Sequence, residues 1–463
     1  MAGNMAFPSD DLRPRPSLPA WPTVPECRNG GHTAVRRLWS AVIVAEQQER
    51  APWVANQKTD SMSAPSRIAI VVHDLANTGG VGTVARFLRD VIGQSKRFEA
   101  DVFSLALSST DRASLRLRDP QTWTQGVRVH SETDGGVAYE HVGAVASEIE
   151  YCRYQPRAAL TERLCDYDLV QVVGGYPAWA HAVRSVDAPV ALQVATLARE
   201  ERASALDAGW HPLSLWRRFM VRVTHRLDHS ALRHIDAAFV ENQWMYDHLS
   251  KHMPPDNVIF APPGVDTEQF SPGPPPSTGD HILSVGRFED PRKNIMLLFE
   301  AYARLRDRAD AVPPLVLAGR SAPPDEAWIR AEVLGIRDAV TFRADVSMEE
   351  LVRLYQTAAL YVVSSNEEGL GLTILEAMAS GRPVVGTACG GPSTTVLDGE
   401  TGRLVPVGDA EALAEAMNDI LRTPERADAM GKRGRERVEQ HFSKTATGQR
   451  FLETYDQLLR DAV

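Results

Sequence analysis

The sequence predicts an α/β protein built from two doubly wound, Rossmann-like parallel sheets. Three observations lead to this prediction. A chain of 463 residues is too long for one hydrophobic core and suits two domains of ordinary size. From residue 67 onwards, short β-branched runs alternate with longer helical patterns, as is typical of parallel βαβ units. The proline-rich stretch 262–277 can continue neither sheet, so it predicts the junction between the two halves.

Short apolar runs predict the strands of both sheets. The runs are 68–72, 100–104, 169–173 and 237–240 in the first half, and 281–285, 315–318, 340–342, 360–364 and 383–386 in the second. Four parts of the chain follow from this pattern. We expect a poorly ordered, proline-rich extension at 1–61, domains at 62–275 and 276–445, and a last helix at 446–463 that crosses back to the first domain.

Composition and charge restrict the class of protein. The chain is 43% hydrophobic and 24% charged, which is the balance of a globular α/β enzyme. Its net charge of −10 argues against a nucleic-acid binder, because such a protein needs an excess of cations to neutralise phosphates. The four cysteines lie far apart, and the apolar stretch near 38–45 is too short to span a bilayer. We therefore expect a reduced, cytoplasmic protein.

The most informative segment is 364–381, which follows an apolar strand and runs into a helical pattern. It places Glu368 in the turn and Glu376 one turn into the helix. Its glycines let the backbone approach a ligand, and the free amides at the start of the helix suit a phosphate group. A carboxylate also accepts hydrogen bonds well from two vicinal hydroxyls. The expected substrate-binding residues here are Gly369, Gly371, Leu372, Thr373 and Glu376.

A second element, 284–295, also leaves a strand and enters an amphipathic helix. Its cations Arg287 and Lys293 can converge on one anion. Fixed cations at this place suit a phosphate, and they would lower the barrier of a reaction in which that phosphate gains negative charge in the transition state. An isolated Arg and Lys pair would usually be a solvated loop, but the strand–turn–helix context favours a site.

These motifs resemble family 4 of the glycosyltransferases, in which two glutamates are separated by seven residues and followed by Glu-Ala-Met-Ala-x-Gly-x-Pro-Val-Val. The resemblance covers roughly residues 67–460 and is strongest after residue 260. It implies the GT-B fold, with two facing Rossmann-like domains and a cleft between them. It also implies that Glu376 binds the ribose, Glu368 meets the transferred sugar, and Arg287 and Lys293 hold the diphosphate. The commonest family pattern has its lysine five residues after the arginine, where this sequence has Arg292. We therefore assign the role to Lys293, with Arg292 as the alternative.

The resemblance further implies a retaining hexosyltransferase that uses a nucleoside diphosphate sugar, and UDP- and GDP-sugars are both open as the donor. We expect no cofactor and no essential metal. The acceptor hydroxyl would belong to a glycan, a glycolipid or a small metabolite. Two alternatives remain open at this point. One is a sugar-nucleotide epimerase on the same fold, and the other is a non-catalytic subunit that binds a sugar nucleotide.

The first half contributes a glycine-rich segment after its first strand. Gly79 and Gly80 would form a phosphate lip whose backbone amides face the diphosphate. Residues 80–85 also fit a dinucleotide-binding fingerprint, but the turn before them is long and the next strand does not end in an acid. We therefore set the dehydrogenase interpretation aside. Many family members have a histidine where this sequence has Thr196, and Arg199 or Glu200 is the candidate to line the acceptor groove instead.

Two further segments have simpler explanations. The basic amphipathic segment 213–226 suits either an anionic lipid surface or a helix packed beneath the following strand, and the pattern favours packing. Contact with the inner face of a membrane is the alternative. Asp166 and Asp168 resemble a metal-binding Asp-x-Asp pair, but they precede a strand instead of following it. We interpret them as solvated residues at the strand entry.

Overall fold

The computed structural model describes residues 64–76, 79–202, 212–309 and 311–462, and the side chains of residues 212–217 are left undescribed. The extension predicted at 1–61 lies outside these residues. The predicted apolar runs all form strands, within two residues of the expected bounds.

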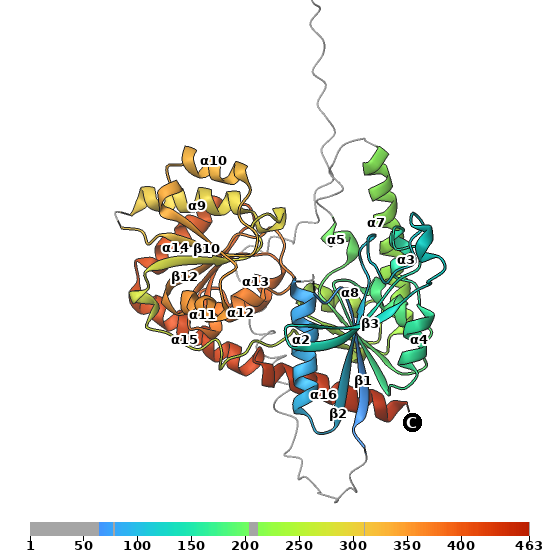
Figure 1. Ribbon diagram of the computed structural model, residues 1–463. Coiled ribbons are helices and arrows are strands. Elements are labelled where there is room, and N and C mark those ends of the chain that lie inside the picture. Colours follow the sequence, from blue (N-terminus) through green and yellow to red (C-terminus); the bar gives the residue numbers. More distant parts are fainter. Residues whose placement is uncertain (1–63, 77–78, 203–211, 310, 463) are drawn as a thin grey trace, which may run out of the picture. The chain divides into compact units, whose positions relative to one another are not determined.

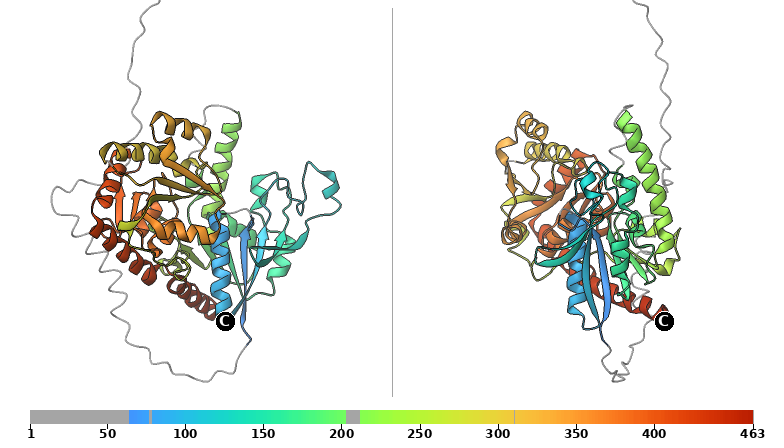
Figure 2. Two further views of the ribbon diagram at one scale, coloured as in Figure 1. Left: turned by 60° about the vertical axis from the view of Figure 1, so that its left-hand side comes forward. Right: turned by 45° about the vertical axis from the view of Figure 1, so that its right-hand side comes forward.

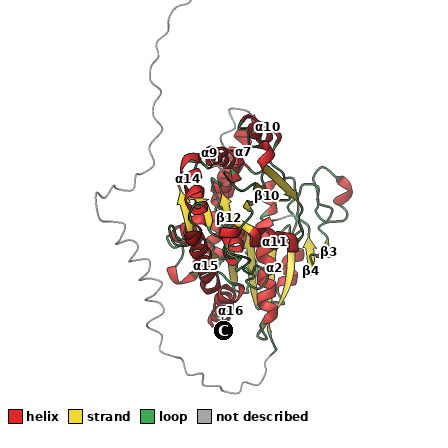
Figure 3. Ribbon diagram, turned by 90° about the vertical axis from the view of Figure 1, so that its left-hand side faces the viewer, coloured by secondary structure: helices red, strands yellow, loops and turns green. Residues whose placement is uncertain are grey.

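The first sheet has the strand order β3-β4-β2-β1-β5-β6-β7-β8. Its strands are parallel except for the antiparallel pair β3–β4, which lies at one edge (Figure 3). The sequence interpretation missed this pair. The strands are β1 (Ser66–His73), β2 (Phe98–Leu105), β3 (Val129–Asp134), β4 (Val137–Val142), β5 (Leu169–Gly174), β6 (Val190–Val194), β7 (Ala237–Val240) and β8 (Val258–Phe260).

The second sheet is parallel throughout, in the order β11-β10-β9-β12-β13-β14. In both sheets the chain builds outwards in one direction and then in the other. The order reverses between β1 and β5 in the first sheet and between β9 and β12 in the second, and such switch points open a crevice at the carboxyl ends of the strands. The strands are β9 (His281–Val285), β10 (Leu315–Gly319), β11 (Val340–Ala344), β12 (Ala358–Val363), β13 (Val384–Thr387) and β14 (Gly402–Val405).

Helices cover both faces of each sheet (Figures 1 and 3). The first sheet packs α2 on one face, where Phe87 and Leu88 join the apolar cluster of Ile68, and α7 and α8 on the other. The helices of the first half are α2 (Gly79–Gln94), α3 (Glu150–Arg153), α4 (Ala158–Leu164), α5 (Ala198–Glu201), α7 (Pro212–Ala231) and α8 (Gln243–Leu249). Those of the second half are α9 (Ile295–Arg308), α10 (Asp325–Val333), α11 (Met348–Thr357), α12 (Leu372–Ala379), α13 (Gly390–Thr395), α14 (Ala410–Leu421) and α15 (Pro424–His441).

The last helix, α16 (Lys444–Asp461), packs on the first sheet although it follows the second. It begins at Ser443, whose hydroxyl caps the helix, and it lies beside α2 (Figure 2). Phe451 and Tyr455 are fully buried in the same apolar cluster as Phe239 of β7. The hydroxyl of Tyr455 donates a 2.8 Å hydrogen bond to the side chain of Gln171. The end of the chain therefore completes the core of the first sheet.

The proline-rich segment between the sheets is held against the start of α16. The amide of Val265 donates to the carbonyl of Phe442 at 2.8 Å, and Lys444 bonds Asp266 at 3.1 Å. A Cβ atom on Gly264 would lie 2.3 Å from the Thr447 hydroxyl, so only glycine permits this approach. The domain boundary at residue 275 stays a prediction.

Candidate active site

The loop after β12 leads directly into α12 at the switch point of the second sheet. Gly371 caps the helix with a φ of 79°, a conformation that favours glycine. Gly371 has no side chain that could cap the helix, so the amides of Leu372 and Thr373 lie uncapped by it at the positive end of the helix dipole. This is the geometry of an anion site, as the sequence predicts.

Glu376 lies one turn into α12, where it contacts a residue that the sequence analysis did not identify. The hydroxyl of Tyr355, on α11, donates a 2.8 Å hydrogen bond to its carboxylate. Burial raises the pKa of Glu376 to about 7, and the bond from Tyr355 opposes part of this rise. The carboxyl group is thus held in place and has further lone pairs for a ligand.

In the loop after β9, the two candidate cations Arg292 and Lys293 have different partners. Lys293 ends the short 3₁₀ turn Pro291–Lys293, and its ammonium group forms an ion pair with Glu368. Arg292 is instead held by Asp290, with a 2.8 Å bond from its terminal nitrogen. Burial alone would raise the pKa of the Asp290 carboxyl group, but the bonds from the Arg292 guanidinium lower that pKa below its usual value. Arg287 is more exposed and lies 3.5 Å from the same carboxylate. The geometry places Lys293, and not Arg292, next to Glu368.

Hydrogen bonds join the loops after β9 and β12 into one framework. The amide of Asn366 donates to the carbonyl of Arg292 at 2.7 Å, and the Ser364 hydroxyl donates to the carbonyl of Lys293 at 2.9 Å. At the start of α13, the amide of Gly391 donates to the carbonyl of Glu368 at 2.7 Å. A Cβ atom on Gly391 would lie 2.4 Å from the carbonyl oxygen of Leu370, so this tight packing requires glycine. The framework fixes the backbone that carries the two glutamates.

One side chain from the first half bonds this loop. Asn242 follows β7, and its amide group donates 2.9 Å hydrogen bonds to the carbonyls of both Ala195 and Gly369. Its side-chain oxygen accepts from the amide of Met245 and caps α8. Sequence reasoning missed Asn242, because a capping asparagine carries no local sign of a second, distant partner.

The glycine lip of the first half differs from the expectation. Gly79 and Gly80 belong to the first turn of α2, not to the loop before it, and residues 77–78 lie outside the described part of the chain. The helix follows β1 at the switch point of the first sheet, so its first amides suit an anion as well. Asp168, by contrast, accepts a 2.7 Å bond from the amide of Arg67 at the entry to β5. It lies at the amino end of the strand, away from the carboxyl ends.

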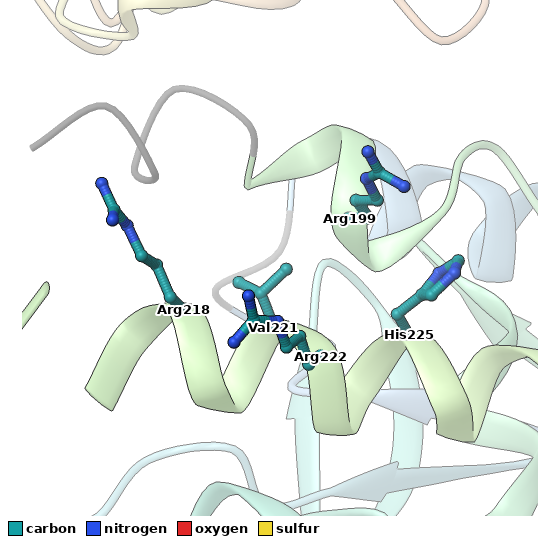
Figure 4. A pocket seen from close by; sticks show the side chains of 5 residues that line it. All are labelled: Arg199, Arg218, Val221, Arg222 and His225. Carbon is teal, nitrogen blue, oxygen red and sulfur yellow. The ribbon is translucent and has the colours of Figure 1, made fainter. Parts of the chain in front are cut away.

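A cationic pocket lies between α5 and α7 of the first half. Figure 4 shows Arg199 on α5 opposite residues of α7. The cavity has a volume of about 500 Å³ and contains no acidic residue in its described lining. The lining residues are Arg199, Arg218, Val221, Arg222 and His225.

Thr196, the residue at the position where many family members have a histidine, lies just before α5. Its amide donates to the carbonyl of Gly175 at 3.0 Å.

The segment 213–226 forms most of α7. Met220, Val221 and Thr224 are buried, whereas Arg222 and Arg226 are exposed, as expected for a packed surface helix. Within the described residues, no helix is both long and apolar enough to cross a bilayer. Contact of this segment with a membrane stays a prediction.

The fold and this constellation define a class. Two doubly wound sheets, with a helix start that suits an anion, two carboxyl groups and a lysine at the switch point of the second, are the arrangement of a sugar-transferring enzyme of the GT-B type. Solved structures agree on the fold. Sucrose-phosphate synthase from Thermosynechococcus elongatus is 23% identical, with a TM-score of 0.67 over 86% of this chain and 100% of its own. Anabaena HepE, solved with UDP and glucose, is 16% identical, with a TM-score of 0.61 over 85% of this chain and 100% of its own.

Sequence relatives identify the family. Residues 265–437 match the model of the group 1 glycosyl transferases. The D-inositol 3-phosphate glycosyltransferase of Kineococcus radiotolerans is 30% identical over 88% of this chain and 98% of its own length. A namesake from Frankia alni is 39% identical over 37% of this chain and 46% of its own. A GDP-mannose-dependent alpha-(1-6)-phosphatidylinositol monomannoside mannosyltransferase of Mycolicibacterium smegmatis is 31% identical over 53% of this chain and 67% of its own length. The chain belongs to glycosyltransferase family 4.

The predicted family, fold class and enzyme class are thereby confirmed. The structure brings Lys293, Glu368 and the start of α12 together, and it places Glu376 on the same helix. Arg287 lies on the same loop as Lys293. The individual roles of these residues stay predictions, as does independence of a metal.

Proposed function

We propose that this protein transfers a hexose from a UDP- or GDP-sugar to an acceptor hydroxyl with retention of configuration and without an essential divalent metal. The observation that carries the proposal is the grouping of Lys293, Glu368 and the first turn of α12 at the switch point between β9 and β12. Helix amides and cations replace the metal that other sugar transferases use to neutralise a diphosphate.

In the proposed reaction the bond between the anomeric carbon and the phosphate oxygen breaks, and the acceptor oxygen bonds to the anomeric carbon on the same face. The acceptor proton passes to the leaving phosphate. Lys293 and Arg287 stabilise the charge that develops on this phosphate. Glu376 accepts hydrogen bonds from the ribose hydroxyls, and Glu368 accepts them from the sugar while Lys293 holds its carboxylate.

The acceptor in this proposal carries a phosphate. The pocket between α5 and α7 supports it, because three guanidinium groups around one cavity suit an anion and would repel a cationic ligand. Two relatives, named as enzymes that act on an inositol phosphate and on a phosphatidylinositol mannoside, agree with this chemistry. The acceptor would then approach from the first half of the chain, where Arg199 is one of the two candidates to line its groove.

Thermal unfolding with UDP, GDP and their sugar conjugates tests the donor. A ligand that binds only the native state raises the unfolding midpoint, and we expect one nucleotide series to do so equally in Mg²⁺ and in EDTA. No shift with any nucleotide in folded protein would refute the proposal. Conversion of the donor without an acceptor would instead identify an epimerase.

Steady-state kinetics with inositol 1-phosphate, inositol 3-phosphate and free inositol as trial acceptors test the pocket. Arg222→Ala should raise the KM of a phosphorylated acceptor about 10- to 100-fold, as expected for loss of a charge-assisted bond, and leave the KM of the donor unchanged. Arg226→Ala is the matched control, because Arg226 is exposed on the same helix and does not line the pocket. Equal effects of the two substitutions would contradict a phosphate site.

A further inference from the structure

A cluster of histidines joins α7 to α8 and the turn that follows it. His229 lies near the end of α7, His248 lies in the last turn of α8, and His252 follows three residues after that helix. The ring centroids of His229 and His252 are 4.9 Å apart, and those of His248 and His252 are 5.1 Å apart. His225 packs against His229 from one turn earlier, at 4.7 Å. None of these residues belongs to the candidate donor site.

The nitrogen atoms of three of these rings converge. His229, His248 and His252 can each offer one ring nitrogen so that all three atoms lie within 4.8 Å of one another. Zinc binds imidazole nitrogen at about 2.0–2.1 Å in tetrahedral geometry, which sets neighbouring nitrogens about 3.4 Å apart. Small rotations of the side chains would close this difference, because His252 is exposed and its ring is not enclosed by the core.

His248 has a polar atom that the packing alone does not explain. Its Nε2 atom is buried and has no hydrogen-bond partner, whereas buried polar atoms in folded proteins nearly always have one. The ring of Trp244 stacks on the same imidazole at 5.5 Å and fixes its plane. A buried imidazole nitrogen without a partner, on a ring whose nitrogens converge with those of two neighbouring histidines, fits a metal ligand.

We propose that His229, His248 and His252 bind a divalent first-row transition-metal ion, with Zn²⁺ as the probe. Imidazole ligands suit Zn²⁺, Ni²⁺ and Cu²⁺ and disfavour Mg²⁺ and Ca²⁺, which prefer oxygen. Three protein ligands leave one tetrahedral position for water or an external ligand.

Metal binding would tie two elements that serve different parts of the candidate active site. The helix α7 carries Arg218 and Arg222 of the cationic pocket, and α8 is capped by Asn242, which bonds the loop of Gly369. A bound ion would hold α7 and α8 in one fixed arrangement. It has no part in the proposed transfer step, which uses the second sheet.

Isothermal titration of the full chain, without a histidine tag and after removal of metals by chelation, tests the site. We expect saturable binding of Zn²⁺ and a higher unfolding midpoint with the ion than in EDTA. Bound Co²⁺ should show the intense visible absorption of tetrahedral coordination. His252→Ala and His229→Ala should each weaken binding at least about tenfold, since each removes a ligand. His234→Ala is the control, because His234 is exposed and lies outside the cluster.

The exposed His252 makes the test decisive even if His229→Ala fails to fold. The His252→Ala variant should unfold in EDTA at the same temperature as the wild-type protein. Wild-type affinity for Zn²⁺ in the His252→Ala variant, or absence of saturable binding in the wild-type protein, would overturn the proposal. Neither result depends on turnover or on a nucleotide, so the transferase proposal is tested separately.

Discussion

Replacing Glu376 with glutamine should make the protein more stable at alkaline pH and at the same time weaken donor binding. The free carboxyl group has a pKa of 4.5, and burial raises the pKa in the folded protein to about 7. Between these values the native state holds a proton that the unfolded chain has released, so stability falls as the pH rises through this window. At about 1.4 kcal/mol for each tenfold change in proton affinity, the loss levels off above pH 7 at about 3 kcal/mol.

Glutamine is neutral at every pH and can still accept the hydrogen bond from Tyr355. We therefore expect denaturant unfolding of Glu376→Gln to show a gain of up to about 3 kcal/mol at pH 8 that fades towards pH 5. Donor affinity, measured by calorimetry, should fall about 10- to 100-fold at pH 8, because charge-assisted bonds to the ribose are lost. Glu415→Gln, an exposed glutamate on α14, is the control. A stability change that does not vary with pH, or unchanged nucleotide affinity, would refute the reasoning.

Three other substitutions test the framework of the site. Lys293→Ala should lower kcat about 10²- to 10³-fold, whereas Arg292→Ala should lower it much less, because Asp290 holds the Arg292 side chain. Equal losses of kcat in the two variants would contradict the choice of Lys293 as the cation of the site. Gly371→Ala should destabilise the protein and weaken nucleotide binding, because its φ is strained for alanine and its Cβ would lie 2.6 Å from the Cδ1 atom of buried Ile374. Gly399→Ala has a similar φ but nothing within 4 Å, so thermal unfolding should show only the cost of strain. Asn242→Asp keeps the cap of α8 but loses the donor to Gly369, and should lower kcat/KM for the donor without a large change in midpoint; an unaltered kcat/KM would show that this bond is dispensable.

The sequence predicted those parts of the fold whose pattern is strong and local. The buried run of β5 and the fully buried β12 follow from apolar composition alone. The strand β3 was missed because its residues are mostly exposed and polar, which is typical of an edge strand. The short β8 was missed because three residues give no periodicity.

The candidate site divides in the same way. Glu368 and Glu376 were predictable, because glycines, a strand and a helix start surround them in one segment. Tyr355 and Asn242 were not predictable, since each contacts the site from another element: Tyr355 lies on α11, before β12, and Asn242 lies in the first half of the chain. The ion pair between Lys293 and Glu368 was not predictable either, because its two residues lie on loops 75 residues apart in the sequence.

The packing of α16 has a consequence for biosynthesis. The first sheet leaves the ribosome before the second, but the apolar surface around Phe239 stays uncovered until Phe451 and Tyr455 have been made. Since domains generally fold from the amino terminus during synthesis, the nascent first half must expose this surface while nearly half of the chain is still being translated. During that interval this apolar surface is a defined target for chaperones. A chain truncated before α16 would leave the surface uncovered.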